Sequence, residues 1–189
     1  MVQPAQALVD FPGRLLIVGF GCIARGVLPL LRRHVGIDPA RIRIVSDRGD
    51  TRGVAAAHGI PLRVEALTRD NYAAILGEEL GAGDFLLNLS INVASVDLVA
   101  WCRAHGVLYL DACIEPWAGG YYDASLTPSQ RSNYGLREQA LALRRPGGDA
   151  GQPTAVLTHG VNPGLGSHFV KKALLDVAAA VGDAGAEPV

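Results

Sequence analysis

Residues 15–26, with the sequence LLIVGFGCIARG, decide the fold of this chain. The apolar run at residues 15–18 predicts a short buried strand, and the pattern GxGxxA follows it at residues 19–24. Apolar residues then recur at helical spacing as far as about His34. A strand, a glycine turn and a helix in this order are typical of a dinucleotide-binding unit.

Each small residue of the turn has a physical role in that interpretation. Gly19 permits the tight turn, Gly21 lets the backbone approach a pyrophosphate, and Ala24 lets the helix pack closely on the strand. The first helical residues, Cys22 and Ile23, present backbone N–H groups and the positive end of the helix dipole to the phosphates. The alternative is a tight turn that packs a helix on a sheet and binds nothing.

The rest of the chain alternates between strand and helix signals. Further strands are predicted at residues 41–46, 61–64, 84–89, 107–110 and 154–158. Helices are predicted at residues 51–58, 71–80 and 93–105, from Ser129 or Ser132 to 144, and at 166–180. This alternation predicts an α/β, Rossmann-type fold, a doubly wound parallel sheet with right-handed crossovers.

Composition excludes several classes of function. The formal net charge is -1 in 189 residues, whereas a nucleic-acid surface needs a basic patch. There is no signal-peptide pattern and no apolar run of ~18 residues, so we expect no membrane span. The three cysteines form no CxxC pair and the histidines are dispersed, so we expect no metal site, reduced thiols and a cytoplasmic location.

Asp47 follows the second predicted strand, where this fold places an acid that binds the adenosine ribose. It lies somewhat further from the glycine turn than the typical ~20 residues, because the connection at 36–41 is long. A carboxylate here repels a 2′-phosphate, so NAD is favoured over NADP. Two alternatives stay open: Asp47 caps the next helix, or the neighbouring Arg48 accepts a 2′-phosphate.

Three polar residues, Asn88, Ser90 and Asn92, stand at the carboxyl end of the fourth predicted strand. Open α/β sheets bind ligands at that edge. Side chains of this kind also tie down loop backbone by local hydrogen bonds. Contact with a ligand and support of the loop are equally good interpretations of these residues.

The fifth predicted strand runs into an irregular loop that carries Asp111, Glu115 and Trp117. Glu115 precedes Pro116, so its backbone must be extended. Acids together with aromatic rings suit a cationic amine, through salt bridges and cation–π contacts. The alternative is an ordered loop in which Trp117 fills the core.

Several segments together resemble the N-terminal half of the bacterial homospermidine synthases, in the saccharopine-dehydrogenase-like group. They include the glycine turn with its helix, IVSDR, DACIEPW at 111–117 and THGVNPGLGSHFVKKAL at 158–174. The resemblance implies an enzyme that makes homospermidine from putrescine, or from spermidine and putrescine. It also implies that bound NAD takes a hydride from the amine carbon and later returns it, so that an aminobutyl group is transferred without net redox change.

The resemblance and the local patterns together give a predicted site. Its cofactor-binding residues are Gly19, Gly21, Cys22, Ile23, Ala24, Asp47, Asn88, Ser90, Asn92 and Asp111. Glu115 is expected to pair with a substrate ammonium beside Trp117, and Asn162 to lie near the nicotinamide. Glu115 and Asn162 are thus the candidate catalytic residues.

The resemblance also bears on domain organisation. We expect a lead-in at residues 1–13, an NAD-binding Rossmann domain at 14–181 and a tail at 182–189. The family's chains are much longer, with a second, substrate-binding domain, so this chain is expected to be a fragment that binds NAD without catalysing. The full-length protein is expected to be a homo-oligomer. A saccharopine-reductase-like NAD(P) dehydrogenase and a non-catalytic NAD-binding module remain alternatives.

Overall fold

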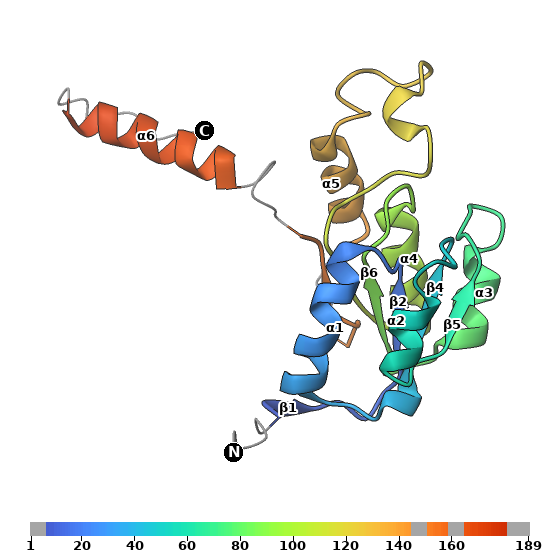
Figure 1. Cartoon of the computed structure of the whole chain (residues 1–189). Helices are drawn as coiled ribbons and strands as arrows, with labels where there is room; N and C mark the ends of the chain where they lie inside the picture. The colour runs from blue at the N-terminus through green and yellow to red at the C-terminus, as the bar shows by residue number, and fades with distance from the viewer. Residues whose placement is uncertain (1–6, 145–150, 159–164, 181–189) are drawn as a thin grey trace. The chain divides into compact units, whose positions relative to one another are not determined.

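The structure is a computed structural model that describes residues 7–144, 151–158 and 165–180. The chain divides into two units, residues 1–157 and 158–189. The first unit contains a six-stranded sheet with helices on both faces (Figure 1). The described part of the second unit contains one helix, α6 (Gly166–Ala180).

All neighbouring strands of the six-stranded sheet are parallel. Across the sheet the order is β5 (Leu62–Val64), β4 (Ile42–Ser46), β2 (Leu15–Val18), β6 (Phe85–Asn88), β7 (Leu108–Asp111) and β8 (Ala155–Val156). The first strand of this sheet in the chain, β2, lies beside the fourth, β6, and the chain order reverses between them. This is the doubly wound order of dinucleotide-binding folds, so the predicted fold class is confirmed.

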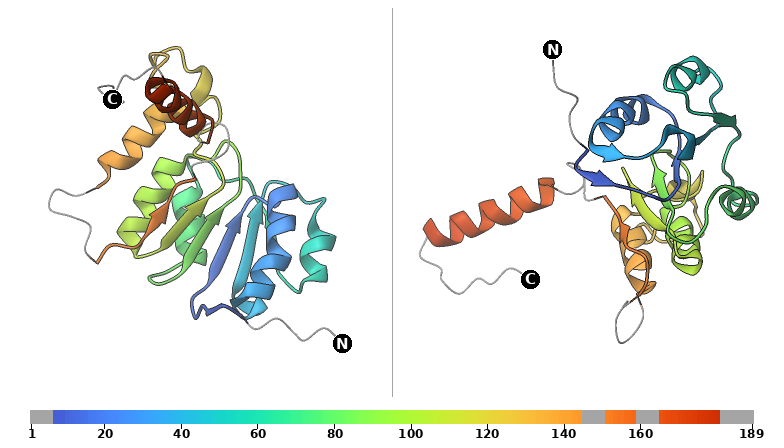
Figure 2. Two further views of the ribbon diagram at one scale, coloured as in Figure 1. Left: turned by 90° about the vertical axis from the view of Figure 1, so that its left-hand side faces the viewer. Right: turned by 90° about the horizontal axis from the view of Figure 1, so that it is seen from below.

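The central strands are mostly apolar because both faces of the sheet are covered there. Leu15 and Ile17 of β2 pack with the helices α1 (Cys22–His34) and α2 (Arg52–Ala57). Their neighbours in the strand belong to the opposite core, with α3 (Tyr72–Glu79) and α4 (Ser95–His105). Figure 2 shows α1 and α2 on one side of the sheet and α4 with α5 (Asn133–Ala142) on the other. Each fully buried aliphatic side chain contributes about 1.5–3 kcal/mol.

Four small elements were not predicted. The strand β1 (Val9–Asp10) lies within the predicted lead-in and pairs with β3 (Val35–Gly36), directly after α1. Two 3₁₀ turns, η1 (Pro39–Arg41) and η2 (Gly120–Tyr122), complete the fold. Elements this short have too few residues for a hydrophobic period, so only their tertiary pairing defines them.

The amino ends of the two central strands are joined by a clasp between Arg14 and Asp84. The backbone N–H of Arg14 donates to Asp84 Oδ1 at 2.7 Å, and its Nε donates to Oδ2 at 2.9 Å. The N–H of Gly81 also donates to Oδ2, at 2.8 Å. Asp84 is buried, so its charge is stabilised by these donors. The clasp lies at the opposite edge of the sheet from the glycine turn.

In the second unit, α6 carries exposed apolar side chains: Phe169, Val170, Leu174, Leu175 and Val177. Across the described parts of the chain, no helix has both the length and the apolar character needed to cross a membrane.

Candidate dinucleotide and amine site

The glycine turn touches the loop after β6. Gly19 has a φ of +83°, and a Cβ on it would lie 2.8 Å from both N and Cα of Ser90. Its N–H donates to the carbonyl oxygen of Val45 at 2.8 Å. Both the conformation and the close approach therefore require glycine here. The turn and the Ser90 loop meet at the point where the chain order of the sheet reverses.

Gly21, in contrast, faces open space. A Cβ on Gly21 would meet no atom within 4 Å. It is the N-cap of α1 and provides no side-chain cap, and the first N–H groups of a helix have no partner within it. Cys22 and Ile23 are exposed, whereas Ala24 is buried against the sheet. Free donors beside open space fit the diphosphate of a dinucleotide.

Asp47 is exposed directly after β4, where a ribose-binding acid belongs. The neighbouring Arg48 turns to Asp50 instead: its Nη2 lies 2.8 Å from Asp50 Oδ2 and its Nε 3.3 Å from Oδ1. The hydrogen bond to Asp50 raises the pKa of Arg48 above its usual value. Arg48 thus has a partner within the chain, while the carboxylate of Asp47 remains accessible to a ligand.

Asn88 takes part in a buried polar network. Its Oδ1 accepts hydrogen bonds from the N–H and Oγ of Ser90, at 3.2 and 2.5 Å. Its Nδ2 donates to the hydroxyl of Tyr109 at 3.4 Å, and that hydroxyl donates to Asp111 Oδ2 at 3.1 Å. Burial, followed by the charge of Asp111, raises the pKa of Tyr109. The amide of Asn88 therefore supports the Ser90 loop, and a direct cofactor contact of Asn88, Ser90 or Asp111 stays a prediction.

A cavity of about 730 Å³ lies among the loops that follow β5, β6 and β7. Three of the predicted site residues line it: Asn92, Glu115 and Trp117. Its charged lining consists of four acids and two arginines: Asp70, Asp97, Glu115, Asp123, Arg69 and Arg131. The excess of carboxylates suits a cationic ligand. Asn162, the remaining predicted catalytic residue, lies outside the described residues.

Asn92 and Trp117 reach the cavity in different ways. Asn92 is exposed, with φ at 62°, in the left-handed region that asparagine tolerates. Trp117 is buried in the core on the α3 and α4 side of the sheet, and its ring lies 5.4 Å from that of Tyr72. Trp117 thus fills the core and forms part of the cavity wall, and its contact with a substrate stays a prediction.

Glu115 is half-buried and lies beside two other titratable groups. Burial and then the Glu115 carboxylate raise the pKa of Cys113 to about 11. The same two causes, in the same order, raise the pKa of Tyr121 to about 12. Among the described residues, no group of three or more His, Cys, Asp or Glu side chains could hold a metal ion. The carboxylate is therefore an acidic group at a cavity wall, available to a cationic partner.

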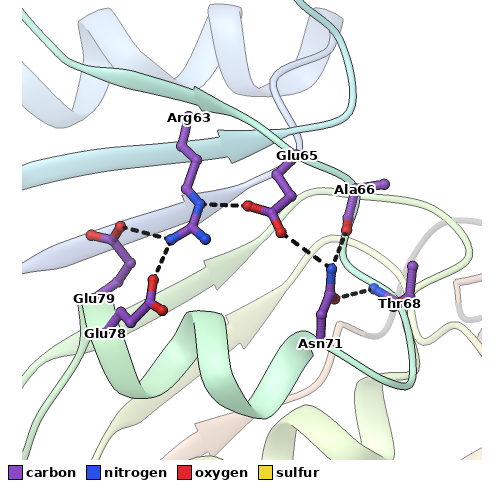
Figure 3. Close-up of polar contacts among 7 residues, drawn as sticks. All are labelled: Arg63, Glu65, Ala66, Thr68, Asn71, Glu78 and Glu79. Atoms are coloured by element: carbon purple, nitrogen blue, oxygen red, sulfur yellow. Dashed lines mark hydrogen bonds and ion pairs between the residues drawn. The ribbon is translucent and has the colours of Figure 1, made fainter.

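The loop between β5 and α3, which forms another wall, is held by polar contacts (Figure 3). Arg63 donates to Glu65 at 2.7 Å and to Glu78 at 2.6 Å. The Oδ1 of Asn71 accepts the N–H of Thr68 at 2.7 Å, and its Nδ2 donates to the carbonyl oxygen of Ala66 at 3.0 Å. These bonds fix the backbone on both sides of the segment that lines the cavity.

Sequence reasoning missed three residues of this region: Ser95, Asp97 and Tyr109. Ser95 bonds to the backbone of Glu115, and Asp97 accepts the indole N–H of Trp117. Tyr109 connects Asn88 to Asp111. A serine and an aspartate at the start of a predicted helix suggest capping, and a tyrosine in a strand suggests packing. No local pattern distinguishes these roles, because the partners lie far apart in the sequence.

The strand order, the open glycine turn and the acid after β4 define a Rossmann-type dinucleotide-binding domain. The chain belongs to the family described as the saccharopine dehydrogenase NADP binding domain, whose model matches residues 15–156. The resemblance expected from the sequence is thereby confirmed at the level of this family.

Longer relatives match almost the whole chain. It is 44% identical over 190 residues to a homospermidine synthase of Blastochloris viridis, covering 98% of this chain and 39% of that protein. It is 40% identical over 184 residues to a homospermidine synthase of Mesorhizobium japonicum, covering 95% of this chain and 37% of that protein. A crystal structure of the Legionella pneumophila homospermidine synthase in complex with NAD is similar with a TM-score of 0.69 and 36% identity, covering 95% and 36% of the two chains. The chain thus spans less than two fifths of the length of these proteins.

Proposed function

We propose that this chain is the NAD-binding part of a homospermidine synthase, an enzyme that transfers an aminobutyl group between polyamines without net redox change. The observation that carries the proposal is the sequence identity of 44% and 40% to two homospermidine synthases along almost the entire chain. The acidic cavity among the loops that follow β5, β6 and β7 supports it, because putrescine and spermidine are polycations.

The chain's own residues divide the binding of NAD between them. The backbone at Gly21 and the first N–H groups of α1 hold the diphosphate, since no side chain occupies that space. The carboxylate of Asp47 accepts hydrogen bonds from the adenosine ribose hydroxyls and disfavours a 2′-phosphate. NAD held in this way would supply a nicotinamide able to accept a hydride from the amine carbon and to return it. Ser90 and Asn92 face the same edge of the sheet and border that half of the cofactor.

Glu115 binds a substrate ammonium at the wall of the cavity. A hydrogen bond between a carboxylate and an ammonium contributes roughly 1.5–3 kcal/mol. Trp117 forms the adjoining wall, and Asn162 is the second proposed catalytic residue. We further propose a cytoplasmic location, which the three free cysteines support, and a homo-oligomeric full-length protein.

Calorimetric titration of the purified chain with NAD tests the cofactor assignment. The reaction is tested with a full-length protein, as long as the relatives, that contains this chain. It is incubated with NAD and putrescine. We expect homospermidine by mass spectrometry and no accumulation of NADH. Accumulation of NADH with an amine or amino acid would support a dehydrogenase instead. Absence of NAD binding in both proteins would overturn the cofactor assignment. From the chain by itself we expect NAD binding without homospermidine.

A further inference from the structure

Ser95 makes hydrogen bonds to both backbone groups of Glu115, its carbonyl oxygen and its N–H. The backbone N–H of Ser95 donates to the carbonyl oxygen of Glu115 at 2.9 Å. The N–H of Glu115 donates to Ser95 Oγ at 3.1 Å. The hydroxyl of Ser95 in turn donates to the carbonyl oxygen of Cys113 at 3.4 Å. One fully buried serine thus satisfies three backbone groups of the loop that carries Glu115.

These bonds are not those of a helix cap. Ser95 is the first residue of α4, and the N-cap is Ala94, which has no side-chain cap. The Ser95 hydroxyl forms its hydrogen bonds with the loop after β7 rather than with the backbone of its own helix. Ser95 is absent from the cavity lining, so its effect on a ligand would be indirect, through residues such as Glu115.

The segment around Glu115 is held by contacts of Trp117 and Tyr121 as well as by Ser95. Between the end of β7 at Asp111 and η2 there is no regular secondary structure. The start of the same loop is bonded to β6, because the N–H of Ala112 donates to the carbonyl oxygen of Asn88 at 3.2 Å. Asn88 holds the Ser90 loop, which packs on the glycine turn. Hydrogen bonds therefore connect the loop that carries Glu115, through Asn88, to the Ser90 loop that packs on the dinucleotide-binding turn.

We propose that Ser95 is a positioning residue that holds the carboxylate of Glu115 at the wall of the cavity, in register with the cofactor-binding turn. The proposal rests on the proposed function, because that function makes Glu115 the ligand of the amine. It predicts that removal of the Ser95 hydroxyl displaces the Glu115 carboxylate while the domain remains folded.

Cys113 provides a local reporter of that carboxylate. Its thiol has a pKa raised to about 11 by burial, by Glu115 and by Asp111, and Tyr121 is the other titratable group beside Glu115. The residue is exposed, so a thiol reagent can reach it. Because the thiolate is the reactive species, a displaced carboxylate accelerates labelling at a fixed pH below the thiol pKa.

The test is a double-mutant cycle with Ser95→Ala and Glu115→Gln in the full chain, in a Cys22→Ser background so that Cys113 is the labelled thiol. The rate of labelling is measured across a pH series. We expect Glu115→Gln to accelerate labelling about threefold to tenfold, as for a thiol pKa lowered by about half to one unit. We expect Ser95→Ala to do the same, and the double variant to match Glu115→Gln.

Ser132→Ala is the matched control. Like Ser95→Ala, this change removes a serine hydroxyl that accepts a backbone N–H, here that of Gly135 at 3.1 Å. Ser132, however, lies at the start of α5. We expect Ser132→Ala to leave Cys113 unchanged. If Ser95→Ala accelerated labelling by the same factor in the Glu115→Gln variant as in the unaltered chain, its effect would not depend on Glu115, and the proposal would be overturned. No acceleration by Ser95→Ala would also overturn it. The cycle needs neither NAD nor amine, so its result is independent of the NAD titration and the homospermidine assay.

Discussion

The indole N–H of Trp117 donates a 2.6 Å hydrogen bond to Asp97 Oδ2, across 20 positions of the chain. The bond joins the loop after β7 to the first turn of α4. The indole ring also packs on Tyr72 at the start of α3. One side chain therefore connects three elements around the cavity.

Replacement of Trp117 by Phe is expected to lower the free energy of unfolding by about 1–3 kcal/mol, because Asp97 loses its partner in a partly buried site. Urea denaturation measures the change. Trp101→Phe, which alters a buried ring stacked on His105, is the control for loss of indole volume. An equal loss in both variants would show that packing, rather than the hydrogen bond to Asp97, is responsible.

The two glycines of the turn are expected to respond in opposite ways to alanine. Gly19→Ala places a Cβ against the Ser90 backbone at a positive φ, so we expect a loss of at least about 1–3 kcal/mol of stability. Gly21→Ala adds a Cβ to open space, so we expect about 1 kcal/mol or less. Because that space is where the diphosphate would lie, Gly21→Ala should nonetheless abolish NAD binding. Thermal unfolding and NAD titration of both variants measure these effects. Tight NAD binding by Gly21→Ala would refute the proposed binding of the diphosphate at Gly21.

Replacement of Asp47 by Ala should weaken NAD binding about 10- to 100-fold, since charge-assisted hydrogen bonds to the ribose are lost. The preference for NAD over NADP should fall with it. Asp50→Asn leaves Asp47 in place but releases Arg48 from its ion pair. We expect this second variant to gain affinity for NADP and to keep that for NAD. Competitive titration with the two cofactors measures both, and equal affinity of the unaltered chain for NAD and NADP would contradict the role of Asp47.

Stability is expected to decline in alkaline solution. Burial raises the pKa of Cys102 from 9.0 to about 12 in the folded chain. The unfolded chain therefore loses this proton first, so the contribution is complete below pH 9 and is lost as the pH rises towards 12. One such thiol changes the free energy of unfolding by about 1.4 kcal/mol per pH unit. Cys102→Ala should flatten the profile above pH 9 in denaturation experiments, and an unchanged slope would assign the decline to other groups, such as Tyr121.

The sheet could be predicted from the sequence because its central strands are buried on both faces. An uninterrupted apolar run such as residues 15–18, followed by glycines, leaves few alternatives to a central parallel strand. The strand predicted from residue 41 begins one residue later, at Ile42, since Arg41 completes η1. The pair β1 and β3 could not be predicted, because two residues show no period and their partners lie across the whole of α1.

The positions of the candidate site residues could be predicted at the glycine turn and less so in the loops. Asp47 follows a strand with a clear pattern, so its position at the sheet edge could be inferred. The partners of Asn88 could not, because Tyr109 and Ser90 meet it only once β6 and β7 lie side by side. Trp117 next to acids suggested an amine contact, but its burial depends on α3 and α4, which no neighbouring residue in the sequence reveals.

The clasp between Arg14 and Asp84 has a consequence for how such a domain can diversify. It stabilises the central strands from the edge opposite the cavity, so its contribution to folding does not depend on which residues occupy the binding loops. Substitutions at Asp47 or Glu115 can therefore alter ligand preference while the two central strands remain anchored. Libraries that vary Asp47 and Glu115 and retain Arg14, Asp84, Ile114 and Trp117 should yield mostly folded variants, and are thus a practical starting point for engineering new cofactor or amine specificities.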